Sequence, residues 1–356
     1  MAFKATPGLN PKSTQSSLID GEAAARASTT TEDDEAALRS EPGARGRDAA
    51  WPSQIPGLGW KDIFWRLLEE FNKDRVLLVA AGATFYLLLA LFPALAAFIS
   101  IYGFVADPIT VADHVAYLGG LLPSGGLDLI RGQLQALARQ NPGALGTGFF
   151  IGLAIALWSA NSGMKALFDA MNIAYEESEK RSFLTLNLMS ILFTVGALLI
   201  AIVLFLTVGV VPALLRYFYL DAWTETLVTL ARWPTLVIAM LTGISLLYRF
   251  GPSRERAKWR WLSWGALAAT AVWIAASWLF SFYLQHFANY NATYGSLGAV
   301  VGLMMWTWIS VIIFIAGAAI NAEMEHQTAC DSTTGPALPM GERGAVVADT
   351  LGKIAE

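Results

Sequence analysis

Six long apolar segments dominate the chain and limit what it can fold into. They lie at 76–104, 145–167, 184–211, 228–250, 262–284 and 296–322. A helix needs roughly 20 apolar residues to cross a hydrocarbon core of about 30 Å. The chain is also 55% hydrophobic and only 15% charged, as expected for a protein whose main solvent is lipid. These segments predict an all-α integral membrane protein with six transmembrane helices.

Lysine and arginine are unevenly distributed between the two sets of flanking segments. Cytoplasmic flanks of membrane proteins carry an excess of these residues. One set of flanks contains twelve Lys and Arg residues and the other contains four, which indicates that the N and C termini are cytoplasmic. The extracytoplasmic segments are then 105–144, 212–227 and 285–295, and we expect short helices in the first of them. The richer set is Lys61, Arg66, Lys73, Arg75, Lys165, Lys180, Arg181, Arg249, Arg254, Arg256, Lys258 and Arg260, and the poorer set is Arg131, Arg139, Arg216 and Arg232.

Three segments differ in composition from the apolar stretches. Residues 1–57 are rich in Ser, Thr, Ala, Gly and charge, which predicts a disordered cytoplasmic tail. The segment "WKDIFWRLLEEFNKDR" has apolar residues at helical spacing, which predicts an amphipathic helix, either in the headgroup plane or packed on the bundle. The membrane domain then covers 58–327. Residues 328–356 form a second polar cytoplasmic tail, expected to be mobile, with a short terminal helix.

The stretch "LWSANSGMKALFDAMNIAYEESEKR" (157–181) leaves an apolar segment with polar residues on one helical face. Asn161, Lys165, Asp169 and Asn172 lie at i, i+4, i+8 and i+11, and Ser159 is close by. Lys165 and Asp169 could neutralise each other at this spacing. Two interpretations stay open: the face lines a polar site between helices, or the helix has reached the interface and Lys165 extends toward water.

Two other polar clusters end apolar segments. Asn291 and Tyr294 precede the last segment, as part of an interfacial aromatic belt or of a polar lining. Asn321 and Glu323 end that segment, and Glu323 is either in water or paired with Lys165 or with a basic residue of 249–260. Pro93 lies inside the first segment and should kink it. Glycine pairs in "GFFIG" (Gly148, Gly152) and "GAVVG" (Gly298, Gly302) suggest close helix packing.

Several kinds of chemistry find no support in the sequence. The three histidines are scattered without metal-ligand spacing, and Cys330 is the single cysteine. No phosphate-binding loop of the Walker type and no serine hydrolase motif occurs. We therefore expect no metal, no cofactor and no enzymatic activity. The basic segment "RFGPSRERAKWRW" is explained by topology, and a phospholipid headgroup is a better anionic neighbour for it than a nucleic acid.

Three ordered motifs resemble the YihY/virulence factor BrkB family of bacterial inner-membrane proteins, once labelled ribonuclease BN. They are "AAGATFYLLLALFPAL", "LWSANSGMKALFDAMNIAYEE" and "NATYGSLGAVVGLMMWTWISVIIFIAGAAINAE", and the resemblance covers roughly residues 60–327. It implies six helices with cytoplasmic termini. Ala319 stands where the family more often has an acid. The matching family positions are Tyr86, Pro93, Trp158, Ser159, Asn172, Tyr175, Tyr294, Gly295, Gly298, Trp306, Asn321 and Glu323.

The residues and the resemblance together favour a translocator of an amphipathic lipid or envelope precursor in the bacterial inner membrane. Membrane lipids are then its partners, and nucleic acid is not. A membrane scaffold that recruits partners through its tails is the alternative. A nuclease would need clustered acids that a metal and RNA can reach, and the sequence does not favour it. The sequence gives no basis for an oligomeric state.

Overall fold

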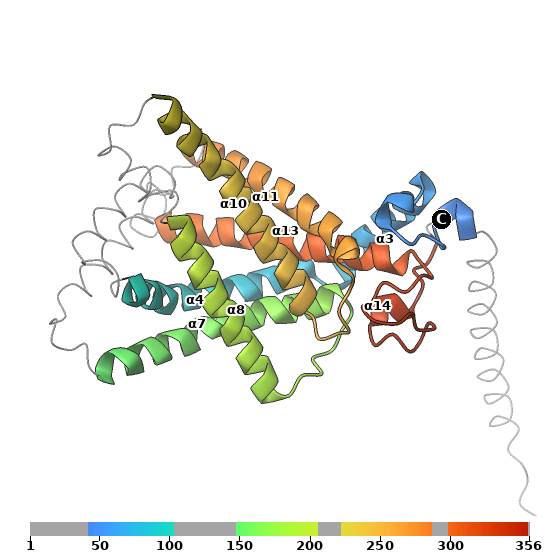
Figure 1. Cartoon of the computed structure of the whole chain (residues 1–356), viewed down its shortest axis with the longest axis horizontal. Helices are drawn as coiled ribbons and strands as arrows, with labels where there is room; N and C mark the ends of the chain where they lie inside the picture. The colour runs from blue at the N-terminus through green and yellow to red at the C-terminus, as the bar shows by residue number, and fades with distance from the viewer. Residues whose placement is uncertain (1–41, 103–146, 206–221, 287–297, 355–356) are drawn as a thin grey trace, which may run out of the picture.

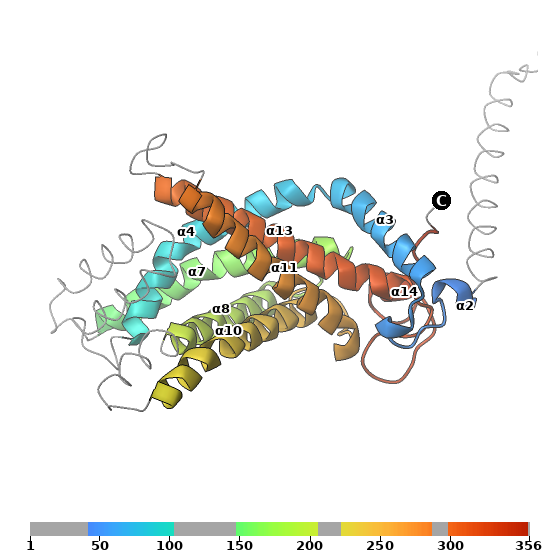
Figure 2. The same cartoon turned by 90° about the horizontal axis from the view of Figure 1, so that it is seen from above.

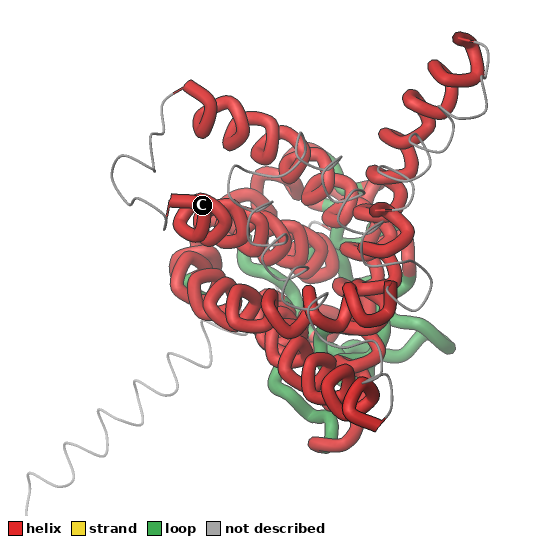
Figure 3. The backbone as a smooth tube through the Cα atoms, turned by 90° about the vertical axis from the view of Figure 1, so that its left-hand side faces the viewer, coloured by secondary structure: helices red, strands yellow, loops and turns green. Residues whose placement is uncertain are grey.

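The computed structural model describes residues 42–102, 147–205, 222–286 and 298–354, and within them it is a bundle of long α helices without a β strand (Figures 1 and 3). This confirms the predicted all-α class. The elements are α2 (Pro42–Arg45), η1 (Pro52–Gln54), α3 (Gly57–Lys73), α4 (Val76–Tyr102), α7 (Thr147–Ala174), α8 (Phe183–Phe205), α10 (Ala222–Phe250), α11 (Trp259–His286), α13 (Gly298–His326) and α14 (Val346–Asp349).

Five described helices are long and apolar enough to cross a membrane. They are α7, α8, α10, α11 and α13. A sixth span results if α3 and α4, which meet at a 60° bend, count as one broken span (Figure 2). Helix α4 continues as one helix through Pro93. The predicted extracytoplasmic helices lie outside the described residues, as do most of the loops that would contain them.

The core is concentrated around α13, which packs against α4, α7 and α11. Phe168, Met171, Tyr248 and Ile315 are fully buried there. Small residues allow the helices to approach closely, because lipid supplies little hydrophobic drive between them. At Gly317, an added Cβ would come within 2.3 Å of the Tyr248 hydroxyl and 2.9 Å of the Gly265 carbonyl. Helices α10, α11 and α13 therefore meet at this glycine.

Two glycines expected to give close packing have no close neighbour among the described residues. A Cβ added at Gly152 or at Gly302 would meet no described atom within 4 Å. Gly302 is buried, but Gly152 is exposed, so the prediction is wrong for Gly152, because spacing alone does not say which face of a helix meets a neighbour. Gly265 and Gly317 take that role instead.

Helix α3 is amphipathic, as predicted, but its polar face is the one that packs inward. Asp62 and Arg66 are buried, whereas Phe64, Trp65 and Leu68 are each at least 44% exposed. The polar face contacts α13, and the aromatic face points away from the bundle. Both interpretations of this helix are therefore compatible with its position.

Residues 42–57 and 328–354 fold together at one end of the bundle, and we call these two segments the cap (Figure 1). Arg47 and Arg343 are buried in it, at 3% and 5% exposure. The expectation of a disordered tail is thus wrong for residues 42–57, and that of a mobile tail is wrong for 328–354. The short terminal helix is present as α14. The remainder of the N-terminal tail, 1–41, lies outside the described residues.

Candidate functional site: a polar seam between α7 and α8

Polar side chains from two neighbouring spans form what we call the polar seam. Helix α7 contributes Asn161 and Lys165, and α8 contributes Asn187, Ser190 and Thr194. The three residues of α8 lie at i, i+3 and i+7, so they share one helical face. All except Lys165 are buried. The seam therefore places amide, hydroxyl and ammonium groups inside a part of the protein that faces lipid on its outer side.

The ammonium of Lys165 is the charged group of the seam. It donates a hydrogen bond of 2.5 Å to Asn187 Oδ1. It also lies 5.7 Å from the ring centroid of Trp158 and 6.0 Å from that of Phe183. Trp158 precedes Lys165 by two helical turns, so the side chain points back toward the start of α7. The ammonium is therefore held within the seam and does not extend past the end of the helix.

Lys165 has no acidic partner among the described residues. No carboxylate oxygen there lies within 4.0 Å of its ammonium. Asp169, one turn later, has an exposed side chain and forms no ion pair within that distance. Lys165 and Asp169 therefore form no direct ion pair, although the charge of Lys165 still acts on the Asp169 carboxyl. Ionisable groups within a membrane are costly and usually pair with one another or face a polar site.

Asn161 is buried without any hydrogen-bond partner. Its exposure is 0%, and neither Oδ1 nor Nδ2 has a partner in the described structure. Leaving a buried amide unsatisfied costs about 1–3 kcal/mol. Asn161 lies one turn before Lys165 on the same face of α7. Its amide is therefore an unsatisfied polar group one turn from the ammonium-bearing residue of the seam.

Asn172 has a different environment from Asn161 and Lys165. Its Oδ1 accepts a 2.7 Å bond from the Ser253 amide, and its Nδ2 donates to Glu179 at 3.1 Å. Burial raises the pKa of Glu179, but hydrogen bonds from Arg181 and Asn172 outweigh it and lower the pKa to about 2. Asn172 thus joins the end of α7 to the α10–α11 turn. The residues predicted to share one polar face therefore lie in two separate environments: Asn161 and Lys165 are in the seam, and Asn172 is at the α10–α11 turn.

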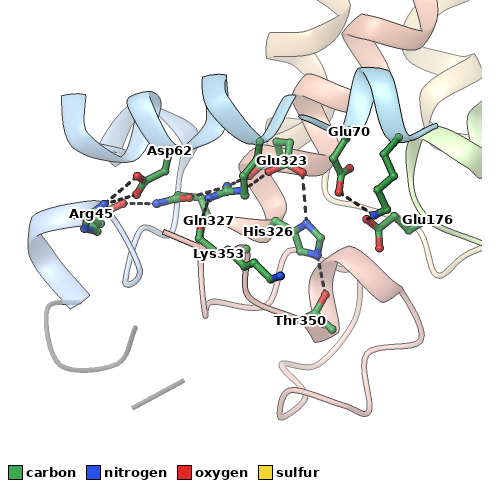
Figure 4. A network of polar contacts seen from close by, with 12 residues as sticks. Arg45, Asp62, Glu70, Glu176, Glu323, His326, Gln327, Thr350 and Lys353 are labelled. Carbon is green, nitrogen blue, oxygen red and sulfur yellow. Dashed lines mark hydrogen bonds and ion pairs between the residues drawn. The ribbon is translucent and has the colours of Figure 1, made fainter. Parts of the chain in front are cut away.

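The end of α13 carries the other predicted polar residues. Asn321 Oδ1 accepts from the Gly265 amide at 2.8 Å, and Asn321 Nδ2 donates to the Leu262 carbonyl at 3.2 Å. Glu323 is bound by Arg66 of α3, with 2.5 Å between Arg66 Nε and Glu323 Oε2 (Figure 4). Glu323 is thus neither in water nor paired with Lys165 or with 249–260. Both residues fasten α13 to neighbouring helices.

A second buried ion pair involves Glu325, which follows Glu323 on α13. Arg254 donates to both carboxylate oxygens of Glu325, at 3.1 and 2.6 Å, and the two side chains are 3% and 0% exposed. The Arg254 guanidinium also lies 5.0 Å from the ring centroid of Tyr175. Burial, and then the charge of Glu325, raise the pKa of the Tyr175 hydroxyl. Tyr175 is therefore a neutral packing residue of the cap end.

The C-terminal segment closes over these ion pairs. Arg66 Nη1 donates to the Lys353 carbonyl at 2.8 Å, and His326 Nε2 lies 2.7 Å from Thr350 Oγ1 (Figure 4). Arg47 Nη2 donates to the Gly352 carbonyl at 2.7 Å. Both terminal segments thereby bind the last turns of α13.

A carboxyl pair lies where α3 meets α4. Lys73 Nζ is 3.5 Å from Glu70 Oε1 and 3.6 Å from Glu176 Oε1. Burial, a hydrogen bond with Glu176 and the charges of Glu323 and Glu176 raise the pKa of Glu70 to about 8, against the opposing effect of Lys73. Glu70 therefore keeps its proton at neutral pH.

The remaining predicted positions are dispersed. Tyr86 and Trp158 are 48% and 57% exposed, and face outward. Ser159 and Pro93 are half-buried, and Gly298 is buried at the start of α13. Trp306 donates to Ser277 Oγ at 3.3 Å. Asn291, Tyr294 and Gly295 lie outside the described residues.

Three residues of the seam escaped the sequence analysis. Asn187, Ser190 and Thr194 stand in "LTLNLMSILFT", where long apolar side chains surround them. Each hydroxyl also bonds a carbonyl of its own helix, Ser190 to Leu186 at 2.8 Å and Thr194 to Ser190 at 2.8 Å. Their i, i+3, i+7 spacing could have predicted a polar face on α8, because it is as regular as the spacing of the polar residues on α7.

Comparison with known proteins assigns the chain to a family. The model for virulence factor BrkB matches residues 67–339. The chain belongs to the virulence factor BrkB family. This confirms the resemblance seen in the three motifs.

Two relatives of this BrkB family chain are similar along most of their length. The ribonuclease-like protein YfkH of Bacillus subtilis is 33% identical over 272 residues, which cover 74% of this chain and 93% of YfkH. The UPF0761 membrane protein IL2447 of Idiomarina loihiensis is 25% identical over 278 residues, with 75% and 94% coverage. No solved structure matches the chain.

Family membership and the apolar helices together establish a membrane protein. The name of YfkH describes YfkH, and several other relatives are named only as membrane proteins. Among the described residues, no group of three or more His, Cys, Asp and Glu is arranged to hold a metal ion. The polar seam combines an unsatisfied buried amide, that of Asn161, with an ammonium that no described carboxylate contacts.

Proposed function

We propose that this BrkB family chain is a multi-pass protein of the bacterial inner membrane, with six spans and a cytoplasmic cap. The excess of Lys and Arg on the flanks at the cap end supports this orientation. Helix α4, with 27 residues, has the length of a sixth span. A cysteine-accessibility map from intact cells and inverted vesicles would test it, and labelling of a cysteine at Leu338 from the outside of intact cells would contradict it.

We further propose that the chain translocates an amphipathic lipid or envelope precursor whose headgroup bears a phosphate or carboxylate. The observation that carries this proposal is the ammonium of Lys165, which binds a neutral amide and has no carboxylate within 4.0 Å among the described residues. A cation in that position gains from an anionic ligand, because no carboxylate of the described residues contacts it directly. A phosphate would receive charge-assisted hydrogen bonds there.

The surroundings of Lys165 suit a molecule that is polar at one end. Trp158 and Phe183, the two aromatic rings beside the ammonium, are 57% and 75% exposed on the lipid-facing surface. The unsatisfied amide of Asn161 lies on the inner side. Acyl chains could thus remain in lipid while the headgroup contacts Lys165, Asn161 and Asn187.

Reconstituted vesicles provide the test. The purified chain in liposomes should move a fluorescent phosphatidylglycerol between leaflets, measured by quenching of the outer leaflet with dithionite. We expect Lys165→Met to slow this movement at least about tenfold, the equivalent of about 1.4 kcal/mol. Lys165→Arg, which keeps the charge, should retain more of the rate.

A matched control comes from Lys61, an exposed lysine of α3. Lys61→Met removes one positive charge at a distance from the seam and should leave the rate unchanged. Equal rates for the wild type and Lys165→Met would refute the proposed role of the seam, as would an equal loss in Lys61→Met.

A scaffold function remains the second candidate, and the cap is the observation in its favour. Both terminal segments form an ordered surface there, with exposed residues at 335–339. Deleting 328–356 would remove partners of Arg66, so it would not be a clean test. Leu338→Asp, which changes an exposed side chain of the cap, avoids this problem. If that substitution abolishes function in cells while Lys165→Met does not, the scaffold function is favoured.

A further inference from the structure

Two groups of arginines at the cap end differ in their partners, and Arg47 and Arg343, which donate to backbone carbonyls, belong to neither group. Arg45, Arg66, Arg181 and Arg254 each lie within 2.8 Å of a carboxylate oxygen. Arg249, Arg256 and Arg260 have no carboxylate oxygen within 4.0 Å among the described residues, although Glu255 adjoins Arg256 in the sequence. The second group therefore leaves positive charge uncompensated at the turn between α10 and α11.

Aromatic rings hold these three guanidinium groups in place. The distances from guanidinium carbon to ring centroid are 4.6 Å for Arg249 on Trp259 and 4.4 Å for Arg260 on Trp51. Arg249 and Arg256 also share the ring of Phe250, at 5.8 and 5.2 Å. A guanidinium stacked on a ring keeps N–H groups at its edge. Arg249 Nη1 donates to the Ala257 carbonyl, so the donors that Arg249 offers an anion are its remaining N–H groups.

The position along the helices points to a membrane surface. Arg249 lies at the end of the apolar stretch Trp233–Phe250, and the stretch Trp259–Leu284 begins at Trp259. The two helices pack side by side (Figure 1). Trp259 is 52% exposed, as is usual for tryptophan at the level of lipid headgroups.

An apolar stripe continues from this point toward the middle of the bundle. Leu267, Ile274 and Trp278 follow Trp259 on the same face of α11 and are 57%, 44% and 68% exposed. On α10, Ile238 lies three turns before Arg249 and is 62% exposed. The charge at the turn and the stripe along the spans match the two ends of a phospholipid.

We propose that the α10–α11 turn binds an anionic phospholipid of the leaflet on the cap side, with its phosphate between Arg249 and Arg256 and its acyl chains along Leu267, Ile274 and Trp278. Arg260, stacked on Trp51, flanks the headgroup. The site is separate from the polar seam and does not depend on the proposed transport. Its ligand is a resident of the membrane, so it would stabilise the protein in bilayers that contain acidic lipid.

Lipid titration of the purified full chain tests the site. Native mass spectrometry in detergent would measure binding of dioleoyl-phosphatidylglycerol and dioleoyl-phosphatidylcholine. We expect the wild type to prefer the anionic lipid. Each arginine near a charged surface contributes roughly a fivefold change in affinity, so Arg256→Gln should weaken binding about fivefold and Arg249→Gln/Arg256→Gln about 25-fold.

The matched control removes two charges elsewhere at the same end. Lys61 and Arg75 are exposed and have no carboxylate oxygen within 4.0 Å among the described residues. Arg75 has a φ of 50°, which asparagine tolerates, so Lys61→Gln/Arg75→Asn is the suitable variant. It should change phosphatidylglycerol binding less than about twofold.

Three outcomes would overturn the proposal. An equal loss in the control pair would show that only net charge matters, and equal binding of phosphatidylcholine would show that the anionic headgroup is not selected. Inorganic phosphate that displaces the lipid at millimolar concentration would show that the site takes free phosphate. Arg256 is exposed and contacts only Phe250 among the described rings and carboxylates, so Arg256→Gln should fold normally and keep the test valid.

Discussion

The cap end and the polar seam both contain cations, but the groups that bind these cations differ. At the cap end, Arg66 and Arg254 each bind a carboxylate of α13, Glu323 and Glu325. In the seam, Lys165 binds only the neutral amide of Asn187. Completed ion pairs hold elements together, whereas an incomplete one leaves binding capacity for something else. The contrast separates a region built for stability from one that can accept a ligand.

Removing a carboxylate from the cap end should have the largest effect. Glu325→Ala leaves Arg254 buried without a counter-ion, and breaking a buried pair in this way costs about 3–5 kcal/mol. Unfolding of the purified protein in mixed micelles, titrated with SDS, would measure the loss. The double variant Arg254→Met/Glu325→Leu removes both charges and should be clearly more stable than Glu325→Ala. If Glu325→Ala lowers the free energy of unfolding by less than about 1 kcal/mol, the ion pairs at the cap end are not the stabilising contacts that distinguish it from the seam.

A Gly→Ala substitution should be more costly where α10, α11 and α13 meet than on α8. Gly317→Ala inserts a methyl group 2.3 Å from the Tyr248 hydroxyl, and overpacking of this kind costs about 1–3 kcal/mol. Gly196 of α8 has no atom within 4 Å of an added Cβ. Gly196→Ala should therefore be neutral or stabilising by up to about 1 kcal/mol, because alanine favours a helix. Equal midpoints of SDS unfolding for the two variants would contradict the difference.

Loss of the lysine in the seam should destabilise the protein less than loss of an arginine at the cap end. Lys165→Met removes an ammonium that no described carboxylate contacts, but it also leaves the buried Asn187 Oδ1 without its donor, so the free energy of unfolding should fall by at most about 1 kcal/mol. Arg254→Met, the matched change at the cap end, should lower it because Glu325 is left unpaired. Parallel SDS titrations would compare them. Strong destabilisation by Lys165→Met would show that this lysine is a structural residue.

The last expected effect is a pH dependence near the cap. Glu70 has a pKa of about 8 in the folded protein and an ordinary value of 4.5. The folded state therefore holds the proton more tightly, and stability from this group declines as pH rises from about 4.5 to 8. Glu70→Gln should flatten this part of a melting-temperature profile, and an unchanged slope would contradict the assignment.

The spans could be predicted from sequence because length and hydropathy decide them locally. The predicted segment at 262–284 lies within α11, and 228–250 lies within α10. The motifs were also sufficient to identify the family. The cap was not predicted, since its composition is that of a disordered tail and its order depends on contacts with distant residues such as Arg66 and His326.

The candidate site was predicted in part. The helical spacing correctly placed Asn161 and Lys165 one turn apart on α7, but the partner of Lys165 lies on α8 and that of Glu323 lies 257 residues away. Pairwise partners of this kind depend on how the helices are rotated against each other, and periodicity within one helix does not contain that information. For the same reason the stacking of Arg249 and Arg256 on Phe250 is visible only in three dimensions.

The contacts between the cap and α13 also set an order for biogenesis. Arg66 enters the chain before every helix from α4 onward, yet its carboxylate, Glu323, belongs to the last long helix. During synthesis, Arg66 therefore lacks its Glu323 partner until α13 has left the ribosome. In a chain that stalls before residue 323, Arg66 stays without this carboxylate, and a membrane protease or chaperone could recognise the unpaired guanidinium.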